Sequence, residues 1–445
     1  RAANAITPDG GTAPIEDVRE PYMAENERLG RQGLRVMATG QRDFDPAAFD
    51  RTATDYLPLV EDLTLLALVG IVDPPRPEAR DAIAVAHSAG IQVRMITGDH
   101  AVTAEAIARQ LGITGRAITG AEFAAMDDDT LRDQIDDIGV IARVAPEDKV
   151  HLVDILKSKG HIVAMTGDGV NDAPALKKAD IGVAMGITGT EVSKEAAVMI
   201  LTDDNFATIV HAVELGRALY DNLVRYIRFQ MAGLFGFIGT FLGASLLFIA
   251  EGMPFLPLQT LWVNFTVQVF LAVGLGYGKA REGLMKDAPR SPTLPILPAR
   301  LLTYLVFIGV VISVLTLGVI SWATTQYGEA VARTMGLTTF ALTNVWFALE
   351  TADEEGSMFS ATTLGNPVLL KAAGLALVAT VVTSELGLLN RILDTVNLTT
   401  DQWLIALVLS LVVIVVAEVK KLLKIRTTDT PRLAEAPVEP VAAAA

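Results

Sequence analysis

The chain has 445 residues, more than one ordinary domain contains, so two or three structural units are expected. Its net charge of −15 argues against a nucleic-acid partner, which would need basic patches to bind phosphate. The sequence contains no cysteine, which excludes disulfides, thiolate metal sites and cysteine nucleophiles and fits a reducing cytoplasm on the soluble side.

Apolar and charged residues are segregated along the chain. The mean hydropathy of +0.41 is high for a soluble protein, yet 20% of the residues are charged. Most aspartates and glutamates lie before Asn222, and the long apolar runs all follow it. The sequence therefore predicts a soluble first half and a membrane-embedded second half.

Residues 1–62 alternate short apolar runs with acidic loops. A helical stretch at 22–32 leads to a strand-like segment at 34–38. This is too little chain to bury a core of its own, so we interpret it as the end of a domain that begins earlier. The first residue is Arg1 and no signal peptide follows it, which predicts that the sequence starts inside a longer protein.

Residues 63–204 alternate strands and helices. We expect strands at 65–72, 93–96, 140–142, 162–165 and 181–183, and helices at 77–89, 103–111 and 148–159. This alternation predicts a Rossmann-like α/β domain with a parallel sheet covered on both faces. Ligands of such sheets bind at the carboxyl ends of the strands.

Residues 205–426 begin with a continuous helical pattern and continue into the membrane half. Six candidate spans are expected, at 229–250, 256–277, 301–322, 330–349, 368–389 and 403–419. The fourth is the weakest because Arg333 and several threonines dilute it, although bundle interiors tolerate such residues. Residues 427–445, rich in proline and alanine, are predicted to form a disordered tail.

Six spans would return the chain to the side on which it started. Basic residues cluster between the second and third spans and again after the last one. The positive-inside rule makes that side cytoplasmic, together with the α/β domain. We therefore expect a multi-pass integral membrane protein of the plasma membrane, in contact with lipid.

Residues suited to phosphoryl transfer follow the predicted strands. Thr97 and Asp168 each come directly after an apolar strand, and Lys149 opens a helix that follows another strand. Asp168 and Asp172 could hold Mg²⁺, which prefers oxygen ligands. Thr97 and the Gly98 amide could bind phosphoryl oxygens while Lys149 offsets their charge.

Each of these motifs is weak alone and stronger as a set. A lone Thr-Gly-Asp is usually a turn, a lone Gly-Asp-Gly is often a loop, and an isolated lysine at a helix start is usually solvated. The unbroken TGDGVNDAPAL run from Thr166 to Leu176, with a strand-end Thr-Gly-Asp and a lysine upstream, is hard to assemble by chance. The set therefore favours a phosphoryl-transfer site.

Several segments resemble P-type cation-transporting ATPases, whose phosphorylation domain belongs to the haloacid-dehalogenase superfamily. They are DPPR at 73–76, MITGD at 95–99, residues 142–149, TGDGVNDAPAL at 166–176, DDNF at 203–206 and WVN at 262–264. The resemblance implies the carboxy-terminal portion of a calcium-pump-like enzyme that couples ATP hydrolysis to cation transport, with ATP and Mg²⁺ as cofactors. Residues 1–62 would end a nucleotide-binding domain, 63–204 would form the phosphorylation domain, and 205–426 the stalk and six transmembrane helices.

The resemblance also implies roles for individual residues. Thr97 would bind the phosphoryl group, Lys149 would contact it, and Asp168 would ligate Mg²⁺. Asn171 and Asp172 would support the same site. The other positions it implicates are Gly98 and Asp99 beside Thr97, Arg35 for an ATP phosphate, and Asp73, Arg76 and Arg143 for the cofactor.

Parts of the family pattern do not occur in this sequence. There is no Asp-Lys-Thr-Gly run with the phosphorylated aspartate, no Thr-Gly-Glu actuator loop and no counterpart of the first four helices. The segment alone is therefore expected to be inactive, as a fragment or a truncated remnant. Its partner would be the missing amino-terminal half of the same pump.

The calcium pump's charged ion ligands are replaced in this sequence. Its fifth-helix Asn and Glu correspond to Leu234 and Phe237, and its sixth-helix Thr and Asp to Val267 and Gln268. Its eighth-helix Glu corresponds to Asn344. Because Ca²⁺ affinity depends on ligand charge, at most one ion site is expected, and the identity of the ion is open.

The oxygen donors that remain near this path are mostly neutral: Asn264, Thr266, Gln268, Thr343 and Asn344. Interhelical hydrogen bonding is the alternative role for the amides of Gln268 and Asn344. Of the carboxylates near the spans, Glu385 is expected to face the bundle and Glu350 to be solvated at a helix end.

Two other functions stay open. A membrane-tethered haloacid-dehalogenase phosphatase would need a nucleophilic Asp-x-Asp-x motif directly after a strand, and none of the predicted strands is followed directly by one. A non-catalytic membrane scaffold or pump remnant would keep the same motifs as inherited relics.

Overall fold

The computed structural model describes residues 2–7, 9–45, 55–71, 75–291, 294–353, 356–423 and 425. The chain forms two compact units, Arg1–His211 and Ala212–Ala445, which are described separately below. Two predictions, the cofactor contact of Asp73 and the disordered tail at 427–445, lie outside the described residues.

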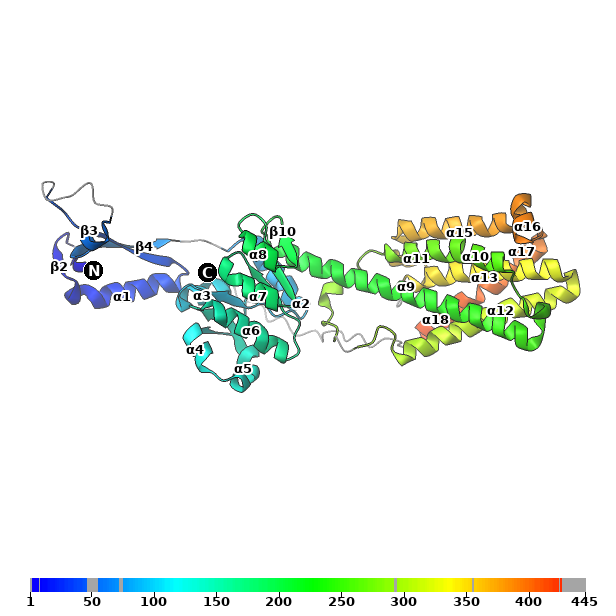
Figure 1. Ribbon diagram of the computed structural model, residues 1–445, viewed down its shortest axis with the longest axis horizontal. Coiled ribbons are helices and arrows are strands. Elements are labelled where there is room, and N and C mark those ends of the chain that lie inside the picture. Colours follow the sequence, from blue (N-terminus) through cyan, green and yellow to red (C-terminus); the bar gives the residue numbers. More distant parts are fainter. Residues whose placement is uncertain are drawn as a thin grey trace. The chain divides into compact units, whose positions relative to one another are not determined.

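The first unit begins with a four-stranded mixed sheet. Its strands are β1 (Ala2–Ile6), β2 (Thr12–Pro14), β3 (Arg35–Gln41) and β4 (Leu63–Ile71), in the order β2-β1-β4-β3. Helix α1 (Ile15–Arg31) runs beside this sheet in Figure 1. We expected β4 to open the parallel α/β alternation, but it pairs antiparallel with β3 and parallel with β1. Apolar run length predicts a strand but does not reveal its partner.

Two three-stranded parallel sheets form the α/β part. One contains β5 (Met95–Thr97), β7 (Ile138–Ala142) and β6 (Arg116–Thr119) in that order. The other has the order β10-β9-β8, with bounds Met199–Leu201, Ile181–Met185 and Ala164–Gly167. The predicted parallel arrangement is confirmed, but the structure divides it into two sheets, and β6 and β10 were not predicted.

One apolar core holds the two parallel sheets together. Ile141 of β7, Met165 of β8 and Ile155 of helix α6 (Pro146–Ser158) are buried in the same cluster. Helix α6 begins with Pro146, which suits the first helical turn, and the Asp148 carboxylate accepts a hydrogen bond from the Ala145 amide at 2.8 Å. The start of α6, where Lys149 lies, is therefore fixed by local chemistry and by the shared core.

The remaining helices of this unit are short. They are α2 (Pro77–Ser88), α3 (Ala101–Gln110), α4 (Gly120–Ala125), α5 (Asp128–Gln134), α7 (Ala173–Lys178) and α8 (Glu191–Ala196), with single turns η1 (Leu57–Leu59), η2 (Ile135–Asp137) and η3 (Val170–Asp172).

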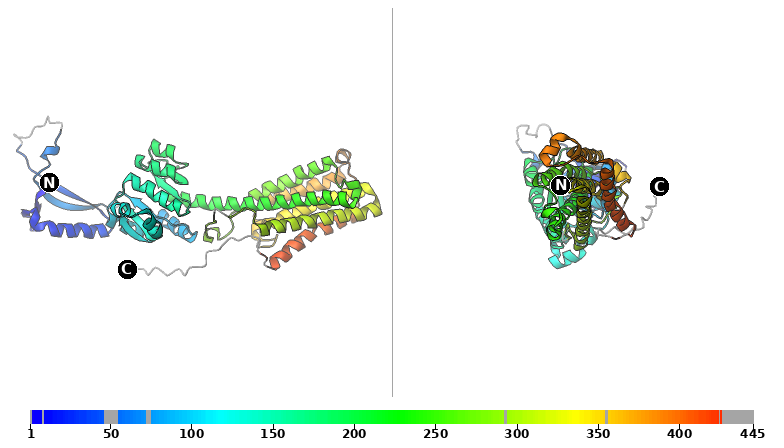
Figure 2. Two further views of the ribbon diagram at one scale, coloured as in Figure 1. Left: turned by 60° about the horizontal axis from the view of Figure 1, so that its bottom comes forward. Right: turned by 90° about the vertical axis from the view of Figure 1, so that its right-hand side faces the viewer.

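The second unit is a helical bundle (Figures 1 and 2). Its helices are α9 (Phe206–Leu247, which begins in the first unit), α10 (Pro257–Val263), the π-helical turn η5 (Asn264–Gln268), α11 (Val269–Gly276), α12 (Ala299–Tyr327), α13 (Glu329–Thr351), α14 (Ala361–Leu364), α15 (Pro367–Glu385), α16 (Gly387–Leu393), α17 (Thr400–Ser410) and α18 (Val412–Leu422). The single turns η4 (Ile249–Gly252) and η6 (Leu284–Lys286) lie between them.

Five helical segments in the described part of the chain are long and apolar enough to cross a membrane, one fewer than predicted. They are Phe206–Leu247, Pro257–Gly276, Ala299–Tyr327, Pro367–Glu385 and Thr400–Leu422. The expected fourth span forms helix α13, but its composition does not meet this criterion. Its polar residues, such as Thr339, Thr343 and Asn344, are buried. The Thr339 and Thr343 hydroxyls donate to carbonyls one turn back on the same helix, at 2.8 and 2.7 Å. The bundle thus encloses α13, which explains why its composition is less apolar.

Asp204 fixes the loop that follows β9. Its carboxylate accepts hydrogen bonds from the Ile187 amide at 3.0 Å and from the Thr188 amide at 2.8 Å and hydroxyl at 2.9 Å. These bonds, the one from Ile187 foremost, lower the pKa of Asp204 from 3.8 to about 2. The backbone carbonyl of Asp204 accepts a further bond from Arg76 Nη1 at 3.2 Å.

This geometry predicts acid lability of the loop. Because the pKa of Asp204 is lower in the folded protein, its hydrogen bonds stabilise the loop fully above pH 3.8. This stabilisation is lost as the pH falls toward 2. Digestion by pepsin, which is active at these pH values, should become faster around residues 186–205 across that range. Asp204→Asn should already be cleaved rapidly at pH 4, whereas Asp133→Asn, a change at an exposed aspartate of the same unit, should match the wild type. Equal cleavage of all three proteins at pH 4 would contradict the assignment.

Candidate phosphoryl-transfer site

The turn after β5 is held by hydrogen bonds to the loop after β7. Within the turn, the Asp99 amide donates to Thr97 Oγ1 at 3.1 Å, and that hydroxyl donates to Asp99 Oδ2 at 3.3 Å. The Val144 amide donates to the Thr97 carbonyl at 3.3 Å, and the Arg143 amide donates to the Asp99 carbonyl at 3.2 Å. Gly98 is exposed, and a Cβ built on it would meet no atom within 4 Å. The turn therefore presents an open backbone amide beside a fixed hydroxyl.

The turn after β8 is organised by the carboxylate of Asp172. Oδ2 of Asp172 accepts hydrogen bonds from the amides of Asp168 at 3.2 Å and Gly169 at 3.0 Å. A Cβ on Gly167 would lie 2.4 Å from the Cβ of Asp172, so only glycine fits this close approach. The Asp168 carbonyl in turn accepts from Ser193 Oγ at 3.1 Å. The backbone of Asp168 is thus held from two sides, and its side chain is exposed.

Lys149 is tied to this turn. Its Nζ lies 2.5 Å from Asp172 Oδ1, and both side chains are largely buried. Asp172 therefore uses one carboxylate oxygen to hold the turn and the other to hold the lysine. This makes Asp172 a positioning residue, and it leaves Asp168 as the better placed carboxylate for a metal ion.

The residues of these two turns could supply only part of the coordination of a Mg²⁺ ion. Within the described ranges, no group of three or more His, Cys, Asp or Glu side chains could hold a metal. Mg²⁺ commonly takes one or two carboxylates and completes its shell with water and phosphate oxygens. Asp168, with an exposed carboxylate on a fixed backbone, suits that mode, whereas Asp172 is already engaged.

The predicted site residues fall into separate hydrogen-bonded groups. Thr97, Asp99 and Arg143 form one group, and Lys149, Asp168 and Asp172 form another. In the part of the chain that the structure describes, no hydrogen bond joins the two groups. The first group lies at the ends of β5 and β7 of one parallel sheet, and Asp168 and Asp172 follow β8 of the other. Lys149 reaches Asp172 from α6, which follows β7. Asn171 is exposed beside the second group.

The other predicted cofactor residues lie apart from these two groups. Arg35 is exposed and pairs with Ile71 in the mixed sheet. Arg76 bonds the carbonyl of Asp204. Arg143 is exposed and has a φ of 53°, an uncommon conformation for a non-glycine residue. The structural roles of Ser193 and Asp204 were missed, although Thr-x-x-Ser at 190–193 is a helix-start pattern that could have drawn attention to Ser193.

Two amides predicted to lie on the ion path meet inside the bundle. Gln268 Nε2 donates to Asn344 Oδ1 at 3.0 Å, and Asn344 Nδ2 donates to the Phe340 carbonyl at 2.8 Å. Gly233 of α9 approaches closely, since a Cβ there would lie 2.7 Å from Gln268 Nε2. Helices α9 and α13 and the π-helical turn η5 therefore meet at one polar point. Such π-helical turns are frequent at functional sites.

The other predicted donors are placed differently. The Thr266 hydroxyl donates to the Trp262 carbonyl of its own helix at 2.7 Å. Asn264 is exposed at the start of η5. The structure thus brings together Gln268 and Asn344, and it shows no hydrogen bond from either to Asn264 or Thr266 among the described residues.

Aromatic rings fill the next turn of the bundle. The rings of Phe237 and Phe340 have centroids 4.3 Å apart, and Phe255 lies 5.6 Å from Phe340. Phe237 is one helical turn beyond Gly233, and Phe340 one turn before Asn344. An apolar cluster therefore lies directly next to the amide pair, at the position where the resemblance would place a fifth-helix carboxylate.

Two expectations about carboxylates are wrong. Glu350 is not solvated but 3% exposed, and it forms an ion pair with Lys421, because α18 packs against the end of α13. Glu385 does not face the bundle interior. It is the exposed last residue of α15, where it accepts hydrogen bonds from Trp403 Nε1 at 3.0 Å and Asn397 Nδ2 at 3.1 Å.

The fold and the two turns define a haloacid-dehalogenase-like domain joined in sequence to membrane helices. Residues 3–180 match the family model described as haloacid dehalogenase-like hydrolase. Residues 252–423 match the model of the cation transporting ATPase C-terminus.

Proteins with similar sequences support both family assignments. A cation-transporting ATPase of Synechocystis sp. is 39% identical over 92% of this chain and 45% of its own length. A calcium-transporting ATPase of Bacillus subtilis is 38% identical over 90% of this chain and 45% of its own length. The chain belongs to the P-type cation-transporting ATPase family and corresponds to the carboxy-terminal portion of its members. It spans about half the length of the curated relatives it matches, and its apolar helices make it an integral membrane protein.

The double role of Asp172 generates a stability prediction. Asp172→Ala removes the acceptor of two backbone amides and leaves Lys149 without its carboxylate, so we expect a loss of about 3 kcal/mol. Asn171→Ala, one residue away and exposed, should change stability by less than about 0.5 kcal/mol. Pulse proteolysis in urea measures both free energies of unfolding. Equal urea midpoints for the two variants would rule out the role given to Asp172.

Proposed function

We propose that this chain provides the Mg²⁺ and phosphate contacts, and part of the ion path, of an ATP-driven cation pump. The observation that carries the proposal is the position of two strand ends. Thr97 is the last residue of β5 and Asp168 follows β8, and each strand is an edge strand of its parallel sheet. Parallel sheets bind their ligands at such carboxyl ends.

The site residues have complementary tasks toward a phosphoryl group. The Thr97 hydroxyl and the Gly98 amide would donate hydrogen bonds to phosphoryl oxygens, and the Lys149 ammonium would offset their charge. Asp168 would hold Mg²⁺, which when bound neutralises charge on the transferring group. Asp172 keeps Lys149 and the Asp168 backbone in place, Asn171 supports the same turn, and Arg143 lies beside the phosphoryl contacts.

The two sheet edges suggest how this site is completed. Edge strands carry unpaired amide and carbonyl groups that can accept a further strand. We propose that a strand from the rest of the pump pairs with β5 on one side and β8 on the other. A nucleophilic aspartate at the end of that strand would lie between Thr97 and Asp168, as phosphoryl transfer to a carboxylate requires.

We further assign the chain's segments by this function. Residues 1–62 would complete a nucleotide-binding domain in which Arg35 contacts an ATP phosphate. Residues 63–204 would form the phosphorylation domain, with Arg76 holding its last loop, and 205–426 the stalk and transmembrane helices, with α13 as an enclosed sixth span. The α/β part would face the cytoplasm at the plasma membrane.

The transported cation would meet mainly neutral oxygens. Gln268 and Asn344 supply amides, and Leu234 and Phe237 supply no oxygen at the neighbouring positions. Ca²⁺ binds most tightly where several carboxylates contribute. The relative from Bacillus subtilis is named a calcium-transporting ATPase, so the natural test titrates the ATPase activity of the complete protein with Ca²⁺, Mn²⁺, K⁺ and Na⁺. Stimulation by none of them favours a non-catalytic scaffold.

The catalytic assignment predicts the behaviour of Asp168→Ala. In the complete protein this variant should form no acid-stable phosphoenzyme from radiolabelled ATP, because the Mg²⁺ site loses its carboxylate. Glu147→Gln, an exposed change near the start of α6, should phosphorylate as the wild type does. Normal phosphoenzyme in Asp168→Ala would refute the role of that residue.

The ion path predicts a separable effect of Gln268→Ala. Loss of the amide that bonds Asn344 should shift the cation concentration for half-maximal phosphorylation by about tenfold, the effect of one strong hydrogen bond. The maximal phosphoenzyme level should stay unchanged, because Gln268 belongs to the helical bundle and makes no contact with the residues assigned to the phosphoryl group. Gln326→Ala, at an exposed glutamine of α12, is the matched control. An unchanged cation dependence would leave the amide pair with a structural role only.

A further inference from the structure

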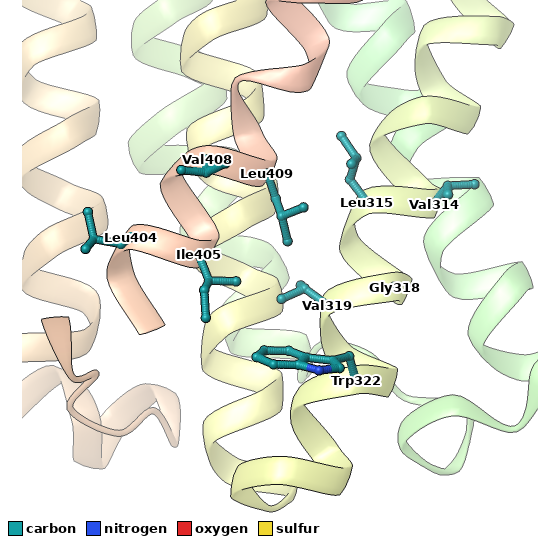
Figure 3. A pocket seen from close by; sticks show the side chains of 9 residues that line it. All are labelled: Val314, Leu315, Gly318, Val319, Trp322, Leu404, Ile405, Val408 and Leu409. Carbon is teal, nitrogen blue, oxygen red and sulfur yellow. The ribbon is translucent and has the colours of Figure 1, made fainter. Parts of the chain in front are cut away.

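An apolar groove lies between α12 and α17. Figure 3 shows the side chains that line it, among them Trp322 and Leu409. Nothing in the structure shows what covers this groove, so we assign no ligand or partner to it.

The turn that carries Asp168 is held by a second segment of the same unit, the start of α8. The Asp168 carbonyl accepts hydrogen bonds from the Thr190 amide at 2.9 Å and from Ser193 Oγ at 3.1 Å. The Asp168 amide donates to Asp172 Oδ2 at 3.2 Å. The exposed carboxylate of Asp168 has no hydrogen-bond partner among the described residues, so the backbone alone sets its position.

The hydroxyl of Ser193 is not needed to begin α8. Thr190 is the N-cap of this helix, and its Oγ1 accepts a hydrogen bond from the Ser193 amide at 3.2 Å. Helix starts of this kind need only the capping side chain. The Ser193 hydroxyl is therefore available for another contact, although it lies only three residues into the helix.

That hydroxyl is fully buried and directed at two carbonyl groups. Ser193 is 0% exposed, and its Oγ lies 3.1 Å from the Asp168 carbonyl and 2.8 Å from the Thr190 carbonyl. Thr190 Oγ1 in turn donates to Ser193 Oγ at 3.1 Å. A chain of hydrogen bonds polarises its members and strengthens them. The contact from Ser193 to Asp168 is thus one link in a buried polar chain.

The segment that carries Ser193 is fixed independently of Asp168. A Cβ on Gly186 would lie 2.6 Å from the Leu201 carbonyl oxygen, and one on Gly189 would lie 2.0 Å from the Met185 carbonyl oxygen. Both positions therefore require glycine, which lets the loop pack tightly on the strand ends. The carboxylate of Asp204 binds two amides of the same loop. The start of α8 is consequently a rigid support for the turn beside it.

A rigid support matters for a metal ligand of this kind. Mg²⁺ demands near-ideal octahedral geometry, so a carboxylate that wanders has to be ordered when the ion binds. Ordering a flexible segment costs conformational entropy, and a ligand fixed in advance avoids that cost. Because no other carboxylate of the turn is unengaged, the orientation of Asp168 decides how well this turn binds the ion.

We propose that Ser193 is a positioning residue for Asp168. Its hydroxyl holds the Asp168 carbonyl, and so keeps the exposed carboxylate in the orientation that binds Mg²⁺. Ser193 itself touches neither the ion nor the phosphoryl group. This inference rests on the proposed function, in which Asp168 holds Mg²⁺.

The test measures Mg²⁺ binding in the complete protein with beryllium fluoride and without ATP, so that no Mg²⁺ is taken up by nucleotide. Hydrogen exchange of the peptide 164–172, followed by mass spectrometry, reports both the mobility of the turn and its protection by the ion. In Ser193→Ala this peptide should exchange about fivefold faster without Mg²⁺, and the Mg²⁺ concentration for half-maximal protection should rise about fivefold, as expected for one lost hydrogen bond. Saturating Mg²⁺ should still give full protection, because the Thr190 amide keeps its bond to Asp168.

Two further variants separate this inference from the proposed function. Ser158→Ala removes a hydroxyl that bonds a carbonyl three residues back, at 2.7 Å in α6, and should change neither value. Asp168→Ala should show no Mg²⁺-dependent protection. If it is protected like the wild type, the assignment of Asp168 fails and the role of Ser193 fails with it. If Asp168→Ala behaves as expected but Ser193→Ala keeps the wild-type Mg²⁺ dependence, with or without faster exchange, the role of Ser193 alone is overturned.

Discussion

The unpaired edges of β5 and β8 are the constraint on which the rest of the α/β unit depends. Each is the edge strand of a three-stranded parallel sheet, and each ends in a turn that carries site residues. Backbone amide and carbonyl groups along an edge need partners when they are buried. A seventh strand between them would satisfy both edges and join the sheets into one. It would also place its own end between Thr97 and Asp168, where phosphoryl transfer requires a nucleophile.

The residues around these two edges are fixed by contacts within the described chain. The core shared by Ile141, Met165 and Ile155 holds both sheets against α6. Asp172 bonds the turn after β8 and the ammonium of Lys149 together. Such preorganisation matters because groups fixed in advance stabilise transferring charge without reorganising. In the bundle, the Gln268–Asn344 pair beside the Phe237–Phe340 rings is similarly fixed.

Local sequence patterns predicted most helices and strands of the α/β part well. They predicted poorly which segments pair or contact one another when these are far apart in the chain. Apolar runs located β7, β8 and β9, and the glycine-rich motif after β8 indicated the turn that contains Asp168, because both signals are contiguous in sequence. The pairing of β4 with β3, the ion pair of Glu350 and the exposure of Glu385 could not be read in this way, since each depends on segments distant in the chain. Helix α13 could not be identified as a span from its composition, because its threonines and Asn344 make it too polar. These residues are buried, since the bundle encloses the helix.

The most direct test of the account is a structure of the complete protein with Mg²⁺ and beryllium fluoride, an analogue of the phosphoryl group. The account predicts a strand hydrogen-bonded to both β5 and β8, with the analogue on an aspartate at its end. The fluoride atoms should lie within hydrogen-bond distance of Thr97, Gly98 and Lys149, and Mg²⁺ should contact Asp168. Direct pairing of β5 with β8, or an analogue bound away from these two turns, would contradict it.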